Sequence, residues 1–106
     1  ITAVDNNINC IEFIRKINKE LNYNINTVQS DCKNFINTIN EKFDIIFMDP
    51  PYNYEQYHTL RELIIEKKII NRDGCLIIEH DRNTIFEDDS IDLRKYGKVY
   101  FSISHL

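Results

Sequence analysis

The 106-residue sequence predicts an α/β fold with a mostly parallel, doubly wound sheet that ends in a β-hairpin. First, short apolar runs alternate with segments whose apolar residues recur every three or four positions, which is typical of strands alternating with helices. Second, residues 43–48 are almost all apolar, as in a strand that is buried on both faces of a parallel sheet. Third, residues 99–104 alternate apolar and polar side chains after Gly97, which predicts a final antiparallel strand.

The first part of the chain is predicted to form two strand–helix pairs. The expected elements are a strand over residues 1–5, a helix over 7–22 capped by Asn6 or Asn7, a strand over 25–30 and a short helix capped by Asp31. The helix over 7–22 is assigned because its isoleucines form one apolar stripe.

The second part begins with the buried strand and continues with one long helix. The expected elements are a strand over 43–48, a helix from Asn53 to about Ile70, a turn over 71–74, a strand over 75–79, a possible helical turn over 82–86, an acidic loop over 87–89 and a hairpin over 91–104. The hairpin makes the predicted sheet a mixed one.

Composition restricts the class of protein. The chain has 42% apolar and 28% charged residues, no apolar run near the roughly 20 residues of a membrane-spanning helix, and no signal peptide. Its net charge of −4 argues against a purely electrostatic nucleic-acid binder. The histidines and the three cysteines lack metal-ligand spacing, so we expect no metal site and reduced, core or near-core thiols in a cytoplasm.

Asp49-Pro50-Pro51-Tyr52 is the clearest candidate for a functional site. The motif directly follows the predicted buried strand, at the end of the sheet where α/β folds bind ligands. The prolines force the chain out of the sheet and leave carbonyl acceptors near the Asp49 carboxylate and the Tyr52 ring. Several acceptors beside one stacking face suit an exocyclic amine on a flat base. The alternative is that the prolines only end a strand and Tyr52 packs on the next helix.

Asp5 and Asp31 also follow predicted strands and would line the same crevice. A carboxylate such as Asp5 can accept both hydroxyl protons of a ribose. The Asp31 carboxylate could accept an adenine amine while the Cys32 backbone N–H meets a ring nitrogen. Both aspartates could instead cap turns and helices. Glu79 and His80 lie at another strand end, and the sequence gives them no step.

These residues resemble a known family. Asp49-Pro50-Pro51-Tyr52 looks like motif IV of amino-group methyltransferases that use S-adenosylmethionine, with Asp5 as ribose acid and Asp31 as adenine contact. The segments 76–80 and 94–102 resemble bacterial 16S ribosomal RNA guanine-N2 methyltransferases of the RsmD type over essentially the whole chain.

The resemblance implies a Rossmann-like class I methyltransferase fold and direct methyl transfer to an unstacked guanine of 16S ribosomal RNA. The family's first strand and its glycine-rich cofactor loop are absent from these residues. The only glycines are Gly74 and Gly97, and neither follows an early strand. We therefore expect residues 1–106 to be the C-terminal part of one catalytic domain and to be incompetent alone. The implied ligands are S-adenosylmethionine and small-subunit ribosomal RNA, with no metal and no membrane.

Three alternatives remain at this stage. An adenine-N6 DNA methyltransferase needs the same acceptors around an amine. A phospho-acceptor receiver domain also places an aspartate after a buried strand, but it would want a lysine where this chain has Glu79-His80. A dinucleotide-binding module is compatible with Asp5 and leaves the motif at 49–52 unexplained.

Overall fold

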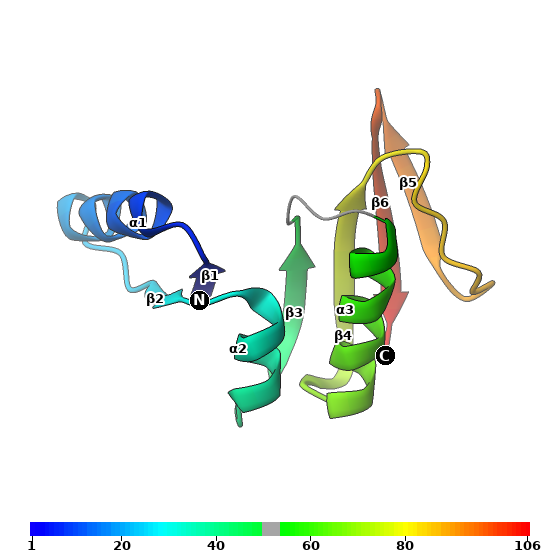
Figure 1. Ribbon diagram of the computed structural model, residues 1–106, viewed down its shortest axis with the longest axis horizontal. Helices are drawn as coiled ribbons and strands as arrows, with labels where there is room; N and C mark the ends of the chain where they lie inside the picture. Colours follow the sequence, from blue (N-terminus) through cyan, green and yellow to red (C-terminus); the bar gives the residue numbers. More distant parts are fainter. Residues whose placement is uncertain (50–53) are drawn as a thin grey trace. The chain divides into compact units, whose positions relative to one another are not determined.

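The computed structural model describes residues 1–49 and 54–106, which form two compact units, Ile1–Ile39 and Asn40–Leu106. Figure 1 shows the helices and strands of each unit. Strands and helices alternate along the described chain as far as the terminal hairpin, which confirms the predicted α/β class. The cap predicted at Asn53 lies outside the described residues.

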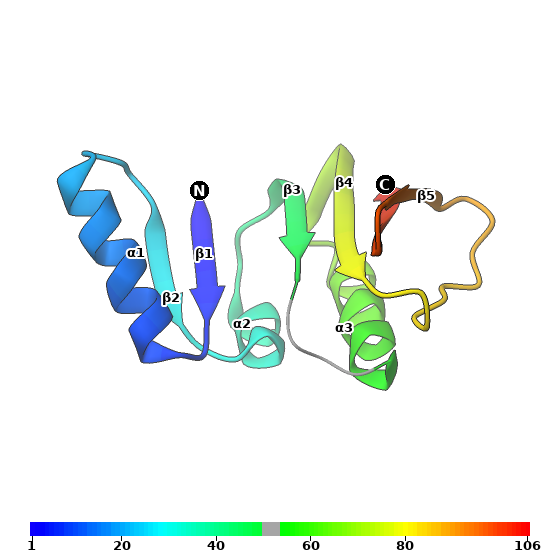
Figure 2. The same cartoon turned by 90° about the horizontal axis from the view of Figure 1, so that it is seen from above.

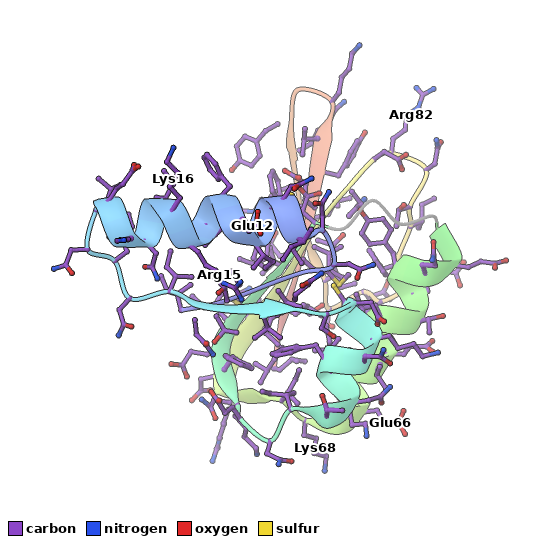
Figure 3. The ribbon with its side chains drawn as sticks, turned by 60° about the vertical axis from the view of Figure 1, so that its left-hand side comes forward. Glu12, Arg15, Lys16, Glu66, Lys68 and Arg82 are labelled. Atoms are coloured by element: carbon purple, nitrogen blue, oxygen red, sulfur yellow. The ribbon has the colours of Figure 1, made fainter. Side chains whose placement is uncertain are left out.

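The first unit is a parallel pair of strands with two helices (Figure 2). Its elements are β1 (Thr2–Asp5), α1 (Ile8–Glu20), β2 (Asn26–Gln29) and α2 (Cys32–Thr38). The Asn7 side chain caps α1, as predicted, and Ile11 is fully buried on the apolar stripe of that helix. Arg15 points from α1 toward β2 and its Nε donates to Thr27 Oγ1 at 3.1 Å (Figure 3).

The second unit is a four-stranded mixed sheet in the order β3-β4-β6-β5, with one helix. Its elements are β3 (Phe43–Met48), α3 (Tyr54–Lys67), β4 (Ile70–His80), β5 (Asp92–Tyr96) and β6 (Val99–His105). β3 and β4 are parallel, whereas β6 is antiparallel to both β4 and β5. Gly97 sits in the hairpin turn at φ 63°, a left-handed conformation that favours glycine. The predicted hairpin and mixed sheet are therefore confirmed.

The core of the second unit lies between α3 and one face of the sheet. Its buried apolar residues include Tyr57, Leu60 and Ile64 of α3 and Met48, Leu76 and Ile78 of the strands. Burying such a side chain contributes about 1.5–3 kcal/mol. The prediction that β3 is buried on both faces is wrong, since Ile45 is 64% and Phe47 58% exposed. Alternate strand residues point to opposite faces, and α3 lies against only one of them.

The predicted turn at 71–74 is also wrong, because β4 runs through it. The pairing of β3 with β4 shifts register between Phe43 and Ile45, and Asp73 adopts a left-handed φ of 67°. The turn-forming residues therefore make an irregularity within the strand rather than a reversal. A Cβ at Gly74 would lie 2.5 Å from the Asp44 carbonyl oxygen, so this close approach of the two strands requires glycine.

Candidate active site

Two carboxyl groups meet where the parallel strands β3 and β4 end. The register pairs Met48 with Ile78, so Asp49 and Glu79 are the next residues on neighbouring strands. The pKa of Glu79 is raised by a side-chain hydrogen bond with Asp49, with further contributions from burial and from the charge of Asp49. Asp49 therefore lies at the strand end where the sequence predicts it, beside Glu79, to which the sequence assigns no step.

Tyr57 brings a neutral hydroxyl to the same end of the sheet. Its ring is buried in the core of the second unit. Burial raises the pKa of the Tyr57 hydroxyl, and the nearby charges of Asp49, Asp81 and Glu79 raise it further. The hydroxyl thus keeps its proton and can act as a hydrogen-bond donor among three acids.

His80 is a structural histidine in this fold. It is buried, with Nδ1 2.7 Å from the Asp81 carbonyl oxygen and Nε2 2.6 Å from Ser102 Oγ. Since a carbonyl oxygen can only accept, Nδ1 carries the proton and Nε2 is free to accept from Ser102. These contacts fix the end of β4, immediately beside Glu79, against β6.

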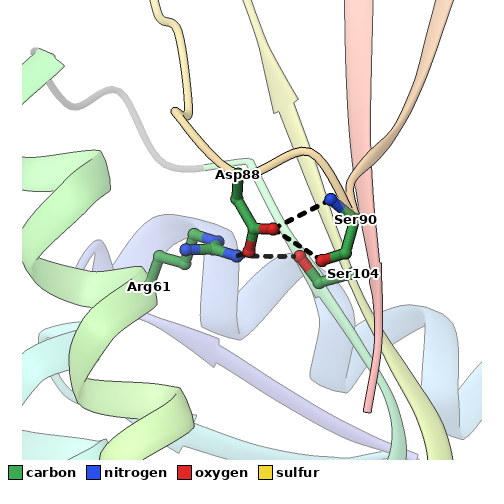
Figure 4. A network of polar contacts seen from close by, with 4 residues as sticks. All are labelled: Arg61, Asp88, Ser90 and Ser104. Atoms are coloured by element: carbon green, nitrogen blue, oxygen red, sulfur yellow. Dashed lines mark hydrogen bonds and ion pairs between the residues drawn. The ribbon is translucent and has the colours of Figure 1, made fainter.

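The loop that leaves β4 is anchored to the sheet and to α3. Arg61 Nη2 donates to Asp88 Oδ2 at 2.9 Å and to Ser104 Oγ at 3.3 Å, while Ser90 donates to Asp88 Oδ1 (Figure 4). The bonds from Ser90, and then the one from Arg61, lower the pKa of Asp88. Phe86 lies 5.6 Å from the Arg61 guanidinium. The helical turn predicted at 82–86 does not form; instead the Asp81 carboxylate accepts the backbone N–H groups of residues 83 and 84.

The aspartates of the first unit lie at the carboxyl ends of β1 and β2. Asp5 Oδ1 accepts the Asn7 N–H at 2.8 Å, and within the described residues its Oδ2 makes no hydrogen bond. Asp31 caps α2, and its two oxygens accept the backbone and side-chain N–H groups of Asn34, each at 2.8 Å. The capping alternative is thus realised for Asp31, and Cys32 is the first residue of α2.

The first unit suits the ribose of a nucleoside cofactor better than it suits the adenine. A ribose diol needs a carboxylate with a free oxygen at a strand end, and Asp5 provides one. An adenine amine would have to use the remaining lone pairs of Asp31, whose oxygens already accept one bond each. Asp5 and Asp31 belong to one unit and Asp49 to the other, while Pro50, Pro51 and Tyr52 lie outside the described residues.

Across residues 1–49 and 54–106, no group of three or more His, Cys, Asp and Glu side chains could hold a metal ion. Cys32 and Cys75 are half-buried, but the expectation of a near-core thiol is wrong for Cys10, which is exposed on α1. In the same described part of the chain, every helix is too short or too polar to cross a bilayer.

Comparison with known proteins places these features in a family. The chain is 32% identical over 71 residues to ribosomal RNA small subunit methyltransferase D of Buchnera aphidicola, a match that covers 65% of this chain and 37% of that protein. A protein of Thermus thermophilus with solved structure superposes with a TM-score of 0.84 at 15% identity, over 99% of this chain and 61% of that one. This chain therefore spans less than two thirds of these relatives.

The fold is shared with proteins that bind the product of methyl transfer. A Podospora anserina methyltransferase solved with S-adenosylhomocysteine superposes with a TM-score of 0.73 at 14% identity, over 100% of this chain and 60% of that one. The fold is thus the Rossmann-like fold of S-adenosylmethionine-dependent methyltransferases, as the sequence predicted. The family described as "Conserved hypothetical protein 95" matches residues 1–105. The chain belongs to this family, the RsmD-type methyltransferases.

Proposed function

We propose that a protein containing this chain transfers a methyl group from S-adenosylmethionine to the exocyclic N2 amine of a guanine in 16S ribosomal RNA. The observation that carries the proposal is the position of Asp49 directly after β3, beside Glu79 on the neighbouring strand, in a chain of this family. Among the described residues, no ion pair neutralises either acid. Such a site suits a neutral hydrogen-bond donor and repels phosphate. The name of the Buchnera relative supports ribosomal RNA as substrate.

The motif at 49–52 handles the base in this proposal. The amine donates to the Asp49 carboxylate and the Pro50 carbonyl, Pro51 stiffens the turn, and Tyr52 stacks on the unstacked guanine. Stacking of this kind contributes about 1–3 kcal/mol per base. The two acceptors align the nitrogen lone pair with the methyl carbon, and alignment supplies a large part of such catalysis.

Methyl transfer to the amine leaves one proton that the nitrogen must lose. The cofactor supplies an electrophilic methyl group. With the cofactor bound, the nitrogen lone pair would take the methyl group, and the electrons of the former bond to that group would stay with the cofactor. The nitrogen then loses a proton, and Asp49 is the acceptor placed to receive it. The buried Tyr57, which keeps its own proton, cannot fill that role.

The first unit holds the cofactor in this proposal. Asp5 accepts from the ribose hydroxyls, Asp31 accepts the adenine amine, and the Cys32 N–H meets a ring nitrogen. Residues 1–106 then form the C-terminal part of one catalytic domain, and the isolated chain binds S-adenosylmethionine weakly or not at all. Micromolar affinity of the isolated chain in calorimetry would contradict this assignment.

The test is methyl transfer by a protein that contains the complete domain. Small-subunit ribosomal RNA and duplex DNA are offered separately, and the modified nucleoside is identified by mass spectrometry. We expect N2-methylguanosine from the RNA and no transfer to the DNA. N6-methyladenine in the DNA would instead support the adenine-N6 alternative.

A further inference from the structure

The hairpin of β5 and β6 carries positive charge in a chain whose net charge is −4. Asp92 is the last acidic residue of the chain, and three cationic side chains follow it, those of Arg94, Lys95 and Lys98. The acidic loop at 87–89 precedes β5, at the end of that strand opposite the hairpin turn. The charge around the turn is therefore opposite in sign to that of the chain as a whole.

Two of these cations are not engaged by acids. Arg94 donates through Nε and Nη2 to the two carboxylate oxygens of Asp92, each at 3.0 Å, so this pair is neutral. Lys95 and Lys98 are exposed, and neither forms an ion pair within residues 1–49 and 54–106. The Lys95 ammonium lies 5.6 Å from the centre of the Tyr100 ring, a contact that orients the side chain without neutralising it. Both lysines can therefore bind an anion.

An exposed aromatic ring accompanies the two lysines. Tyr96 is the last residue of β5 and is 64% exposed. Its ring contacts that of Phe101 on β6, with 5.9 Å between the ring centres and 67° between the planes. The ring is thus supported by the sheet while most of its surface faces solvent. Such a ring can stack on a nucleic-acid base of any identity.

The hairpin turn lies at the same end of the sheet as the candidate active site. Phe101 is opposite Glu79, and Arg94 is opposite Phe101, so these residues form one row across the sheet. Asp49 follows β3 at the same level, three strand spacings or roughly 14 Å from β5. Figure 1 shows the turn projecting beyond the carboxyl ends of β3 and β4.

Resting on the proposed function, we propose that this hairpin turn is a docking site for the ribosomal RNA strand beside the target guanine. Lys95 and Lys98 bind phosphate groups, and Tyr96 stacks on an unpaired base. Charge complementarity favours RNA, because the acids around Asp49 repel phosphate whereas the lysines attract it. The exposed ring favours a strand with unpaired bases over a duplex. The hairpin thus holds the RNA while the guanine leaves its stack.

The test is binding of small-subunit ribosomal RNA to the complete domain, measured by filter binding at several salt concentrations. In the double variant Lys95→Ala with Lys98→Ala, we expect affinity to fall on the order of 10-fold at 0.1 M salt. The slope of log affinity against log salt should decrease by about 0.7 for each lysine. Arginine at both positions keeps the charge and should restore binding.

Tyr96→Ala tests the stacking contact separately. We expect RNA affinity to fall about fivefold or more, with no change in the salt slope, because stacking involves no charge. Tyr96→Phe keeps the ring and should bind RNA like the wild type. In Tyr96→Ala and in the lysine double variant, the Michaelis constant for RNA should rise while S-adenosylmethionine affinity stays the same.

The matched control is the double variant Lys42→Ala with Lys67→Ala. It removes two exposed lysines at the other end of the same sheet, one directly before β3 and one at the end of α3. This variant should keep the wild-type affinity and salt slope. An equal loss of RNA affinity in the control and in the hairpin double variant would overturn the proposal. Wild-type affinity in the lysine double variant and in Tyr96→Ala would overturn it as well.

RNA binding is measured without methyl transfer, which keeps this inference apart from the proposed function. If the hairpin variants weaken RNA binding but the wild type forms no N2-methylguanosine, the substrate assignment fails and the docking site stands. If N2-methylguanosine forms but the hairpin variants bind RNA like the wild type, only the docking site fails. Tighter binding of duplex DNA than of RNA would also refute the docking site, because a duplex offers Tyr96 no unpaired base.

Discussion

The two units place acids at the same kind of position and use them differently. In the first unit, Asp5 and Asp31 follow parallel strands, and each accepts hydrogen bonds from residues two or three positions along the chain. In the second unit, Asp49 follows a parallel strand and pairs with Glu79, which is 30 positions away. An acid that follows a strand can therefore have either of two roles. It can cap the next turn or helix, or it can face a residue on a neighbouring strand.

The local environment decides which outcome occurs. A carboxylate followed by a helix finds unsatisfied backbone N–H groups nearby, as Asp31 does at α2. Asp49 is followed by two prolines, which carry no N–H to donate. Its nearest carboxylate neighbour is instead Glu79 of the adjacent strand. Four substitutions test this contrast.

Asp49→Asn should have the largest effect. The amide keeps the shape but loses the charge and can present a donor to the substrate's donor. Loss of a positioned electrostatic contact typically costs about 100- to 1000-fold in turnover. Single-turnover methyl transfer by the complete domain measures the loss, with cofactor affinity followed alongside and the exposed Asp89→Asn as matched control. A parallel loss of cofactor binding would make Asp49 a cofactor ligand instead.

Asp5→Asn should distinguish the role of Asp5 in the turn from its proposed role in binding the ribose. The amide oxygen still accepts the Asn7 N–H, so the turn should survive. Charge-assisted bonds to a ribose contribute about 1.5–3 kcal/mol each, so losing their charge should raise the Michaelis constant for the cofactor about tenfold or more. Initial-rate kinetics of the complete domain provide the measurement. If the Michaelis constant for the cofactor were unchanged in both Asp5→Asn and Asp5→Ala, Asp5 would stabilise only the turn.

Gly74→Ala should loosen the strand pair that sets Asp49 beside Glu79. The new methyl group would meet the Asp44 backbone, which cannot rotate away, and such overpacking costs about 1–3 kcal/mol. Denaturant unfolding of wild type and variant measures the cost. In the control Gly97→Ala, the methyl group meets nothing within 4 Å and only the left-handed φ is strained. Equal stability of wild type and Gly74→Ala would show that the strands can separate freely.

Asp88→Asn should have the smallest effect, and one that depends on pH. The pKa of Asp88 is lowered in the folded chain, so its contribution to stability is present above the ordinary aspartate pKa. It is lost as pH falls through the lowered value. The melting temperature of Asp88→Asn should therefore be below that of wild type at neutral pH and equal to it in strong acid. Asp89→Asn should match wild type at both, and a pH-independent difference for Asp88→Asn would contradict the linkage.

Much of the fold can be predicted from the sequence because the patterns that indicate it are local. The stripe of α1, the cap at Asp31 and the alternation of β6 each lie within a few residues. The motif at 49–52 is equally local. The sequence misassigned Asn71–Gly74 because turn-forming residues can also bend a strand, and only the partner strand decides between these outcomes.

The rest of the site depends on pairings that no local pattern contains. Glu79 was recognised at a strand end without a role, because its hydrogen bond to Asp49 follows from strand register. The place of Tyr57 among three acids depends on where α3 lies against the sheet. The bond between Arg61 and Asp88 joins residues 27 positions apart.

The position of β6 has a consequence for how the second unit is made. β6 is the last strand to be synthesised in this chain, yet it lies between β4 and β5. Until the ribosome has added it, β5 has no partner in the sheet and Ser102 cannot hold His80. The sheet thus closes only after β6 has been synthesised, and until then one edge of β4 is exposed to other nascent chains. A nonsense codon before Val99 would remove β6, which lies between β4 and β5, rather than an edge strand of the sheet.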